Sequence, residues 1–186
     1  MSNPTFKVTF TLDAEDVAYF RRLFRTARKA ANTVDEAKIV RGAKKLLGDV
    51  RATKKTPKFV LEAMTTLEDL IELIEDSDYS PPKSVRNRIL GALAYFGNPG
   101  DLIPDHIPVF GFLDDALMVK LVDDEFRYEL SAFRKFRRYR QGAEQRPWTA
   151  AARERHSDRL QLKRAQLRTE VTRKLQRGAG RKSLFG

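Results

Sequence analysis

The chain contains no cysteine, a single tryptophan and only two histidines among its 186 residues. Without cysteine it can form neither a disulfide framework nor a thiolate zinc site, which fits a reducing cytoplasm. It has no run of about 18 uncharged apolar residues, the length that a membrane-spanning helix needs. Its first ten residues also lack the basic region and long apolar run of a signal peptide. We therefore expect a cytoplasmic location.

The charge that the chain does carry is unevenly distributed. The net charge is +11. Residues 141–186 hold 12 Lys/Arg against 4 Asp/Glu, an excess of eight, whereas the first 140 residues hold 24 against 21, an excess of three. This asymmetry predicts a polyanionic partner, either nucleic acid or an anionic membrane surface. The alternative is a solvated basic arm that only improves solubility.

The apolar pattern predicts a mainly α-helical fold. We expect a compact bundle of about five helices, one short N-terminal β-strand and a basic C-terminal helical arm. Apolar residues at helical spacing place the helices near 14–31, 34–50, 57–76, 82–96 and 113–140, and a last one over 147–177. The folded domain is then residues 1–140. Residues 141–186 form the arm, with 141–146 as a linker and a disordered end.

Local signals mark where several of these helices begin. Asp13 is a predicted N-cap, with Asp16 three residues later. The segment 33–36 reads as a capping box for the second helix, and Thr56 before Pro57 predicts the start of the third. The third helix has an acidic outer face, for which we expect a solvated surface. Its members are Glu68, Asp69, Glu72, Glu75 and Asp76.

The predicted strand is the segment 6–12, in which Phe6, Val8 and Phe10 alternate with polar residues. An isolated strand leaves its backbone groups unpaired. We therefore interpret it as pairing with the same strand of a second copy, which would give a homodimer. The alternative is an extended arm that lies across the helices.

The segment 98–115 combines three prolines, two glycines and four aspartates with apolar residues. The run Asp101-Leu102-Ile103-Pro104-Asp105, followed by Ile107-Pro108, Gly111 and Leu113-Asp114-Asp115, resembles the YkvA-like family, a small bacterial domain of unknown function. The resemblance covers 81–122 and implies a helical hairpin, with no assigned activity. The prolines and glycines are consistent with a tight connection between two helices.

The carboxylates of this motif have two interpretations. In the first, Asp101 and Asp105 accept backbone N–H bonds in turns, and Asp114 and Asp115 stabilise the first turn of the next helix. In the second, Asp101, Asp105, Asp114 and Asp115 converge on Mg²⁺, Mn²⁺ or Ca²⁺, which prefer oxygen ligands, and His106 joins them for a transition metal. We favour the first interpretation and expect no cofactor.

The basic arm therefore carries the main functional hypothesis. We predict a helical binding protein, not an enzyme, whose arm contacts RNA, the ribosome or other nucleic acid through phosphates. The residues assigned to this contact are Arg137, Arg138, Arg140, Trp148, Arg153, Arg159, Lys163, Arg164, Arg168, Lys174, Arg177, Arg181 and Lys182. The alternatives are a peripheral membrane protein that uses the apolar hairpin and the basic arm, and a divalent-metal-dependent enzyme at the aspartate-rich loop.

Overall fold

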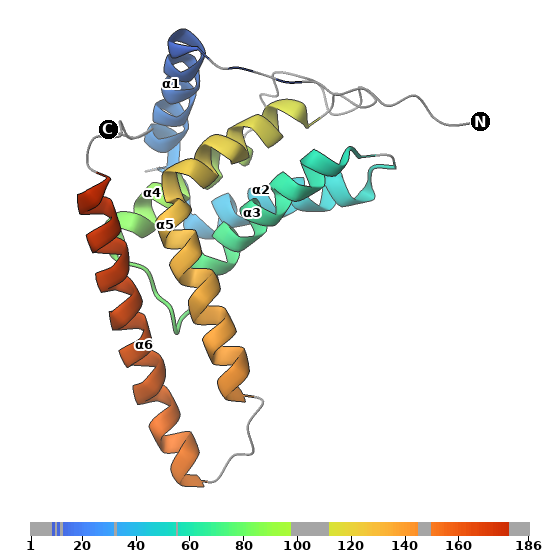
Figure 1. Cartoon of the computed structure of the whole chain (residues 1–186). Coiled ribbons are helices and arrows are strands. Elements are labelled where there is room, and N and C mark those ends of the chain that lie inside the picture. Colours follow the sequence, from blue (N-terminus) through green and yellow to red (C-terminus); the bar gives the residue numbers. More distant parts are fainter. Residues whose placement is uncertain are drawn as a thin grey trace.

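The computed structural model describes residues 9, 11, 13–31, 33–54, 56–97, 112–144 and 150–178, without the side chains of 30–31 and 150–154. These ranges contain six helices (Figure 1): α1 Ala14–Ala31, α2 Glu36–Ala52, α3 Lys58–Glu75, α4 Lys83–Phe96, α5 Leu113–Glu144 and α6 Ala150–Arg177. The predicted mainly helical fold is confirmed. Of the predicted strand, Thr9 and Thr11 are not in a strand, whereas Phe6, Val8 and Phe10 lie outside the described residues.

The helices pack around two central members, α4 and α5. The first two helices, α1 and α2, both contact α4, and α3 packs between α2 and α5. The last helix, α6, lies along the second half of α5 (Figure 1). It returns antiparallel to α5, because Gly178 at its end lies against the hydroxyl of Tyr128.

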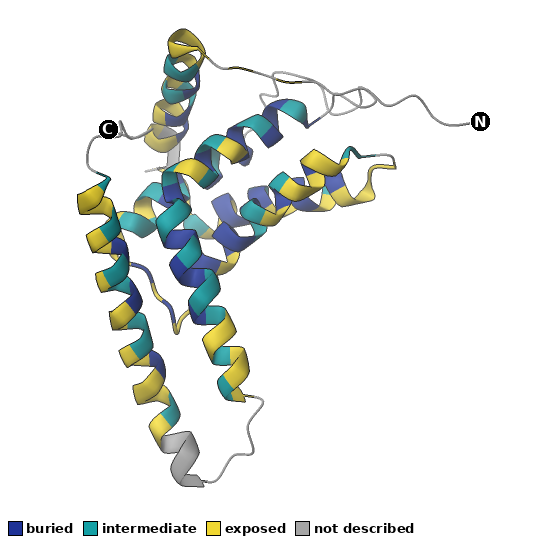
Figure 2. Cartoon of the chain, viewed as in Figure 1, coloured by how far each residue is buried: buried dark blue, intermediate teal, exposed yellow. Residues whose placement is uncertain are grey.

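One hydrophobic core joins residues from all six helices. Phe24, Leu67, Leu93 and Phe133 are fully buried within it. The narrow apolar stripe of α6 also belongs to it, through Leu160, Leu167 and Val171. Figure 2 shows this helix with its buried residues toward α5 and its exposed residues along the outer side. The burial of this stripe orients α6, because it determines which side of the helix faces water.

The helix starts follow the predicted signals only in part. The predicted N-cap is confirmed, since the Asp13 carboxylate accepts N–H bonds from Glu15 and Asp16 at 2.7 and 2.9 Å. The predicted capping box at 33–36 is wrong. There Asp35 is the N-cap, and the carboxylate of Glu36 pairs with Arg86.

The start of α3 is also displaced from its prediction. The helix begins at Lys58, with Pro57 as the N-cap residue. The hydroxyl of Thr56 instead donates to the carbonyls of Val50 and Thr53, both at 3.0 Å. Thr56 therefore closes the end of α2 rather than starting α3, because the last carbonyls of a helix also need hydrogen-bond donors.

The predicted linker at 141–146 is wrong over most of its length. The helix α5 continues to Glu144. The basic cluster of this helix, at positions 134, 135, 137, 138 and 140, therefore lies before its last turn. The last turn contains no basic residue. Interaction with the helix dipole therefore does not explain this cluster, because that effect is confined to the last turn.

Two glycines set the spacing between α2 and the end of α4. A Cβ placed on Gly42 would lie 2.7 Å from the Cα of Gly97, closer than atoms can pack. The two backbones therefore touch, and only glycine fits at position 42. This contact fixes the exit of α4, immediately before the segment 98–111, which lies outside the described residues.

Candidate functional site

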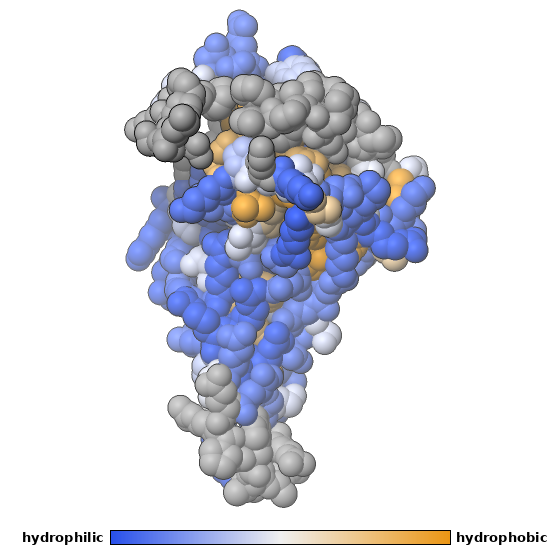
Figure 3. All heavy atoms as spheres, turned by 90° about the vertical axis from the view of Figure 1, so that its right-hand side faces the viewer, coloured by the Kyte–Doolittle hydropathy of each residue, from blue (hydrophilic) through white to orange (hydrophobic). Residues whose placement is uncertain are grey.

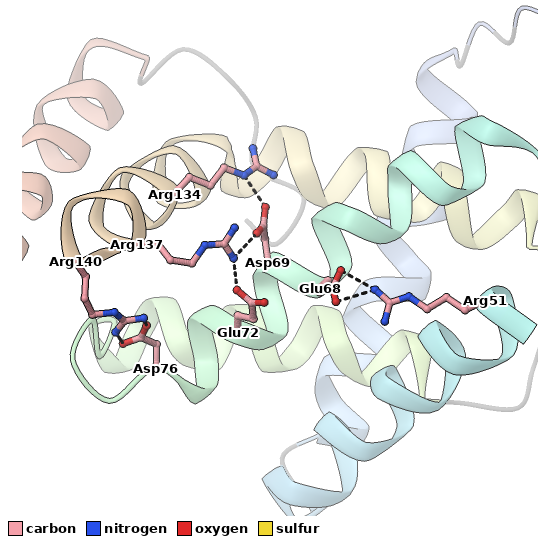
Figure 4. Close-up of polar contacts among 8 residues, drawn as sticks. All are labelled: Arg51, Glu68, Asp69, Glu72, Asp76, Arg134, Arg137 and Arg140. Atoms are coloured by element: carbon pink, nitrogen blue, oxygen red, sulfur yellow. Dashed lines mark hydrogen bonds and ion pairs between the residues drawn. The ribbon is translucent and has the colours of Figure 1, made fainter. Parts of the chain in front are cut away.

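A row of ion pairs joins α3 to the second half of α5 (Figure 4). The buried carboxylate of Asp69 accepts from Arg134 Nε at 2.6 Å and lies 3.0 Å from Arg137 Nη1. The same Arg137 also pairs with Glu72. One turn further along, Arg140 pairs with Asp76 at 2.8 Å. We call these six residues (Asp69, Glu72, Asp76, Arg134, Arg137 and Arg140) the ion-pair row.

The ion-pair row corrects the expectation that the acidic face of α3 is a solvated surface. The other two acidic residues of this face are also paired. Glu68 lies 2.8 Å from Arg51, and Glu75 lies 2.6 Å from Lys44. The side chain of Asp69 is only 6% exposed. The face therefore forms interhelical ion pairs, for which α2 and α5 supply the cations, while Glu72 and Glu75 also remain exposed to solvent.

The row also shows what two of the predicted nucleic-acid-binding residues contact. Arg137 and Arg140 point toward α3 in Figure 4, and both are already paired with carboxylates. Hydrogen bonding to Asp76, aided by Asp78, raises the pKa of Arg140 above its ordinary value. These guanidinium groups therefore have a structural role between helices.

A buried hydroxyl–carboxylate pair lies next to this row. The hydroxyl of Tyr79, in the turn after α3, donates to Glu129 Oε1 on α5 at 2.8 Å. The side chain of Tyr79 is fully buried, with its ring edge-on to Phe133 at a centroid distance of 5.2 Å. Burial, together with the nearby carboxylate, raises the pKa of Tyr79, and burial also raises the pKa of Glu129. Charged side chains near Glu129 include Arg168 from α6 and Arg88 from α4.

Two arginines attach α6 to the turn that carries Tyr79. Arg164 donates to the carbonyl of Asp78 at 3.2 Å. Arg168 donates to the carbonyl of Tyr79 at 3.3 Å and to that of Ser80. The backbone of Ser80 is left-handed, with a φ of 40°. Because side-chain donors satisfy the carbonyls of this turn, α6 is held by hydrogen bonds on one flank of its apolar stripe.

The other flank of α6 is held by contacts with α5. Glu170 lies 2.6 Å from Lys135 Nζ and 2.7 Å from Lys174 Nζ. Hydrogen bonds from these two ammonium groups lower the pKa of Glu170 to about 2. Lys163 lies over the ring of Tyr139 at 5.4 Å. Four of the predicted nucleic-acid-binding residues, Lys163, Arg164, Arg168 and Lys174, therefore contact the protein itself.

Four other cations of α6 point outward. Arg155, Arg159, Arg173 and Arg177 are exposed, and we call them the α6 basic face. Their spacing places them on one side of the helix. Arg159, Arg173 and Arg177 make no hydrogen bond or ion pair with any described residue. Leu162, on the same side, is 71% exposed. Arg155 and Arg173 were missed by the sequence prediction, although the same four-residue spacing marks them.

The other predicted site residues are placed as follows. Arg138 is exposed on α5, and the side chain of Arg153 is not described. Trp148, Arg181 and Lys182 lie outside the described residues. For the predicted metal site, Asp101, Asp105 and His106 also lie outside them. Asp114 and Asp115 are buried in the first turn of α5, at the predicted position. Within the described ranges, no group of three or more acidic or histidine side chains could hold a metal ion.

One face of the described surface is mainly polar. Figure 3 shows one face covered largely by hydrophilic side chains, with apolar atoms visible in a limited area of its upper half. None of the six described helices combines the length and the apolar character that crossing a bilayer requires.

Comparison with known proteins identifies the segment that contains the motif. Residues 86–121 match the family described as "Protein of unknown function (DUF1232)". The chain is also similar to the "Uncharacterized membrane protein YkvA" of Bacillus subtilis (strain 168). The two are 33% identical over 86 residues, which are 45% of this chain and 80% of the relative. The chain belongs to the YkvA-like DUF1232 family. No solved structure matches it.

The YkvA-like segment makes structural contacts through two arginines at its start. Arg86, its first residue, pairs with Glu36 and donates to the carbonyl of Ile74 at 2.8 Å. Arg88 pairs with Glu125 and lies over the ring of Phe126. The family segment therefore joins α4 to α2, α3 and α5, whereas the α6 basic face lies outside it.

Proposed function

We propose that this protein is a peripheral membrane-binding protein that attaches to anionic lipid headgroups through the α6 basic face. The observation that carries the proposal is the orientation of α6. Leu160, Leu167 and Val171 bury one stripe against α5, and the α6 basic face is left exposed. An outward row of arginines complements a surface of phosphates, because each guanidinium can form two hydrogen bonds to phosphate oxygens.

The length of the α6 basic face suits a flat, extended partner. Fourteen residues separate Arg159 from Arg173, so the two lie about 21 Å apart along the helix. Each basic side chain near an anionic leaflet contributes about 1 kcal/mol. Leu162, on the same side of the helix, is an exposed aliphatic side chain that can enter the headgroup region.

Two further observations favour a membrane over nucleic acid. Sequence-tolerant binding of single strands uses aromatic side chains on which bases stack, and the α6 basic face has none among its exposed members. The Bacillus subtilis relative, 80% of which is covered by the match, is described as a membrane protein. Nucleic-acid binding, which the sequence also predicts, is the alternative that the experiment below distinguishes from membrane binding.

The test is cosedimentation of the full chain with vesicles that contain phosphatidylserine. The variant Arg159→Gln/Arg173→Gln/Arg177→Gln removes three outward charges and should reduce affinity about a hundredfold, from about 1 kcal/mol per residue. The matched control, Lys38→Gln/Arg41→Gln/Lys54→Gln, removes three exposed charges elsewhere and should bind nearly as the wild type does.

Equal loss in both variants would show that only net charge matters and would contradict a role for the α6 basic face. A wild-type chain that ignores the vesicles but shifts RNA in a gel would support nucleic-acid binding instead.

A further inference from the structure

A second basic surface lies on α1, a helix to which the sequence analysis gave no function. Arg22, Arg25 and Lys29 are exposed, and we call them the α1 basic face. Their spacing of three and four residues places them on one side of the helix. Phe20, Phe24 and Ala27 occupy the opposite side and are buried. The packing of α1 on α4 therefore turns three cations outward.

Among the described residues, no carboxylate forms an ion pair with this face. The carboxylates of α1, Glu15 and Asp16, both lie in its first turn, where Asp16 also accepts from the backbone N–H of Asp13 at 3.1 Å. The five carboxylates of α3 pair with α2, α5 or α3 itself. Arg25 and Lys29 form no hydrogen bond or ion pair with a described residue, and Arg22 lies over the Tyr19 ring at 5.7 Å.

The net charge of the first 140 residues does not reveal the local excess of cations on α1. The first 140 residues carry an excess of only three positive charges. The five carboxylates of α3 pair with α2, α5 or α3 itself, and α1 carries five cations against two carboxylates. An ordinary solvated helix face mixes both signs. The last three turns of α1 carry only cations, and a charged face of one sign complements a partner of the opposite sign.

We propose that the α1 basic face is a second contact with the anionic membrane surface that the α6 basic face binds. The proposal rests on the function proposed above. The exposed ring of Tyr19, beside Arg22, suits the headgroup region, where aromatic side chains with one polar end accumulate. In Figure 1 α1 and α6 both lie at the left of the molecule, whereas the tips of α2 and α3 lie at the right.

Two contacts on one molecule strengthen binding more than either alone, because the second forms without a new loss of translational freedom. The experiment compares three forms of the full chain on vesicles of phosphatidylcholine and phosphatidylserine: wild type, Arg22→Gln/Arg25→Gln/Lys29→Gln, and the α6 triple variant described above. The α1 variant should bind at least about tenfold more weakly than the wild type.

The charge-conserving variant Arg22→Lys/Arg25→Lys should retain binding, and it controls for damage to the helix. Circular dichroism checks that all forms are equally helical. If the α6 variant loses binding while the α1 variant binds as the wild type does, α1 is not a contact, and the role of α6 stands. If the wild type does not bind the vesicles, both proposals fail together.

Discussion

The second half of α5 and the outer side of α6 are both rich in arginine, yet the fold uses them differently. On α5, Arg134, Arg137 and Arg140 meet carboxylates of α3 and its following turn. On α6, Arg159, Arg173 and Arg177 meet no described carboxylate. Residue type alone therefore does not identify a binding surface. What distinguishes the two is whether the packing of helices brings an acidic partner within reach.

The two regions should differ most in how far a substitution lowers the free energy of unfolding. Asp69→Asn removes the buried charge that Arg134 and Arg137 share, so that Arg134 loses its carboxylate while Arg137 keeps Glu72. The unfolding free energy should fall by about 2–3 kcal/mol, below the range for fully buried pairs because both arginines are partly exposed. Arg173→Gln on the α6 basic face should change it by less than about 0.5 kcal/mol. Urea denaturation of both variants tests the contrast, and equal losses would refute it.

The buried pair of Tyr79 and Glu129, beside the ion-pair row, should make the stability of the protein depend on pH. Burial raises the folded-state pKa of Glu129 above its unfolded value. The folded protein therefore binds the Glu129 proton more tightly than the unfolded chain does. The contribution of Glu129 to the free energy of unfolding is fully present below the ordinary glutamate pKa. It is lost as pH rises through the folded pKa. Glu129→Gln keeps an acceptor for the Tyr79 hydroxyl and should remove this loss.

Denaturation of both forms at several pH values measures the effect. Wild-type stability should decline between the two pKa values of Glu129, while the variant should lack that component. Parallel pH profiles for the two proteins would show that Glu129 does not titrate in this range.

The smallest expected effect lies at the contact between α5 and α6. Lys135 and Lys174 lower the pKa of Glu170 to about 2, so its stabilising contribution is present above the ordinary glutamate pKa. It is lost as pH falls from about 4.5 toward 2. Because the pair is exposed, Glu170→Gln should cost at most about 0.5 kcal/mol at neutral pH. A loss several times larger would mean that the ion pair, rather than the apolar stripe, holds α6 in place.

Local features of the fold were predictable from sequence. The apolar face of α3, with Val60, Met64 and Leu67, follows helical spacing and is buried. The Asp13 N-cap and the start of α5 at Leu113 were also correct. These features depend on neighbours within a turn or two of helix, so the sequence contains the information that they need.

The functional surfaces were harder to predict because they depend on distant partners. Asp69 and Arg134 are 65 residues apart, and Tyr79 and Glu129 are 50 apart. One signal was available: the acids at 69, 72 and 76, in α3 and just after it, and the arginines of α5 at 134, 137 and 140 follow similar spacing in the same order. Recognising them as partners requires knowing that α3 packs on α5, which no local pattern shows.

The central claim is that the outward cations of α6 bind an anionic membrane surface. The most direct measurement is the affinity of the wild-type chain for vesicles as the fraction of phosphatidylserine and the salt concentration are varied. The affinity should rise with the anionic lipid fraction. It should fall steeply with salt, because exposed charges are screened over about 8 Å at physiological ionic strength. Equal affinity for neutral and anionic vesicles, or no binding to either, would contradict the claim.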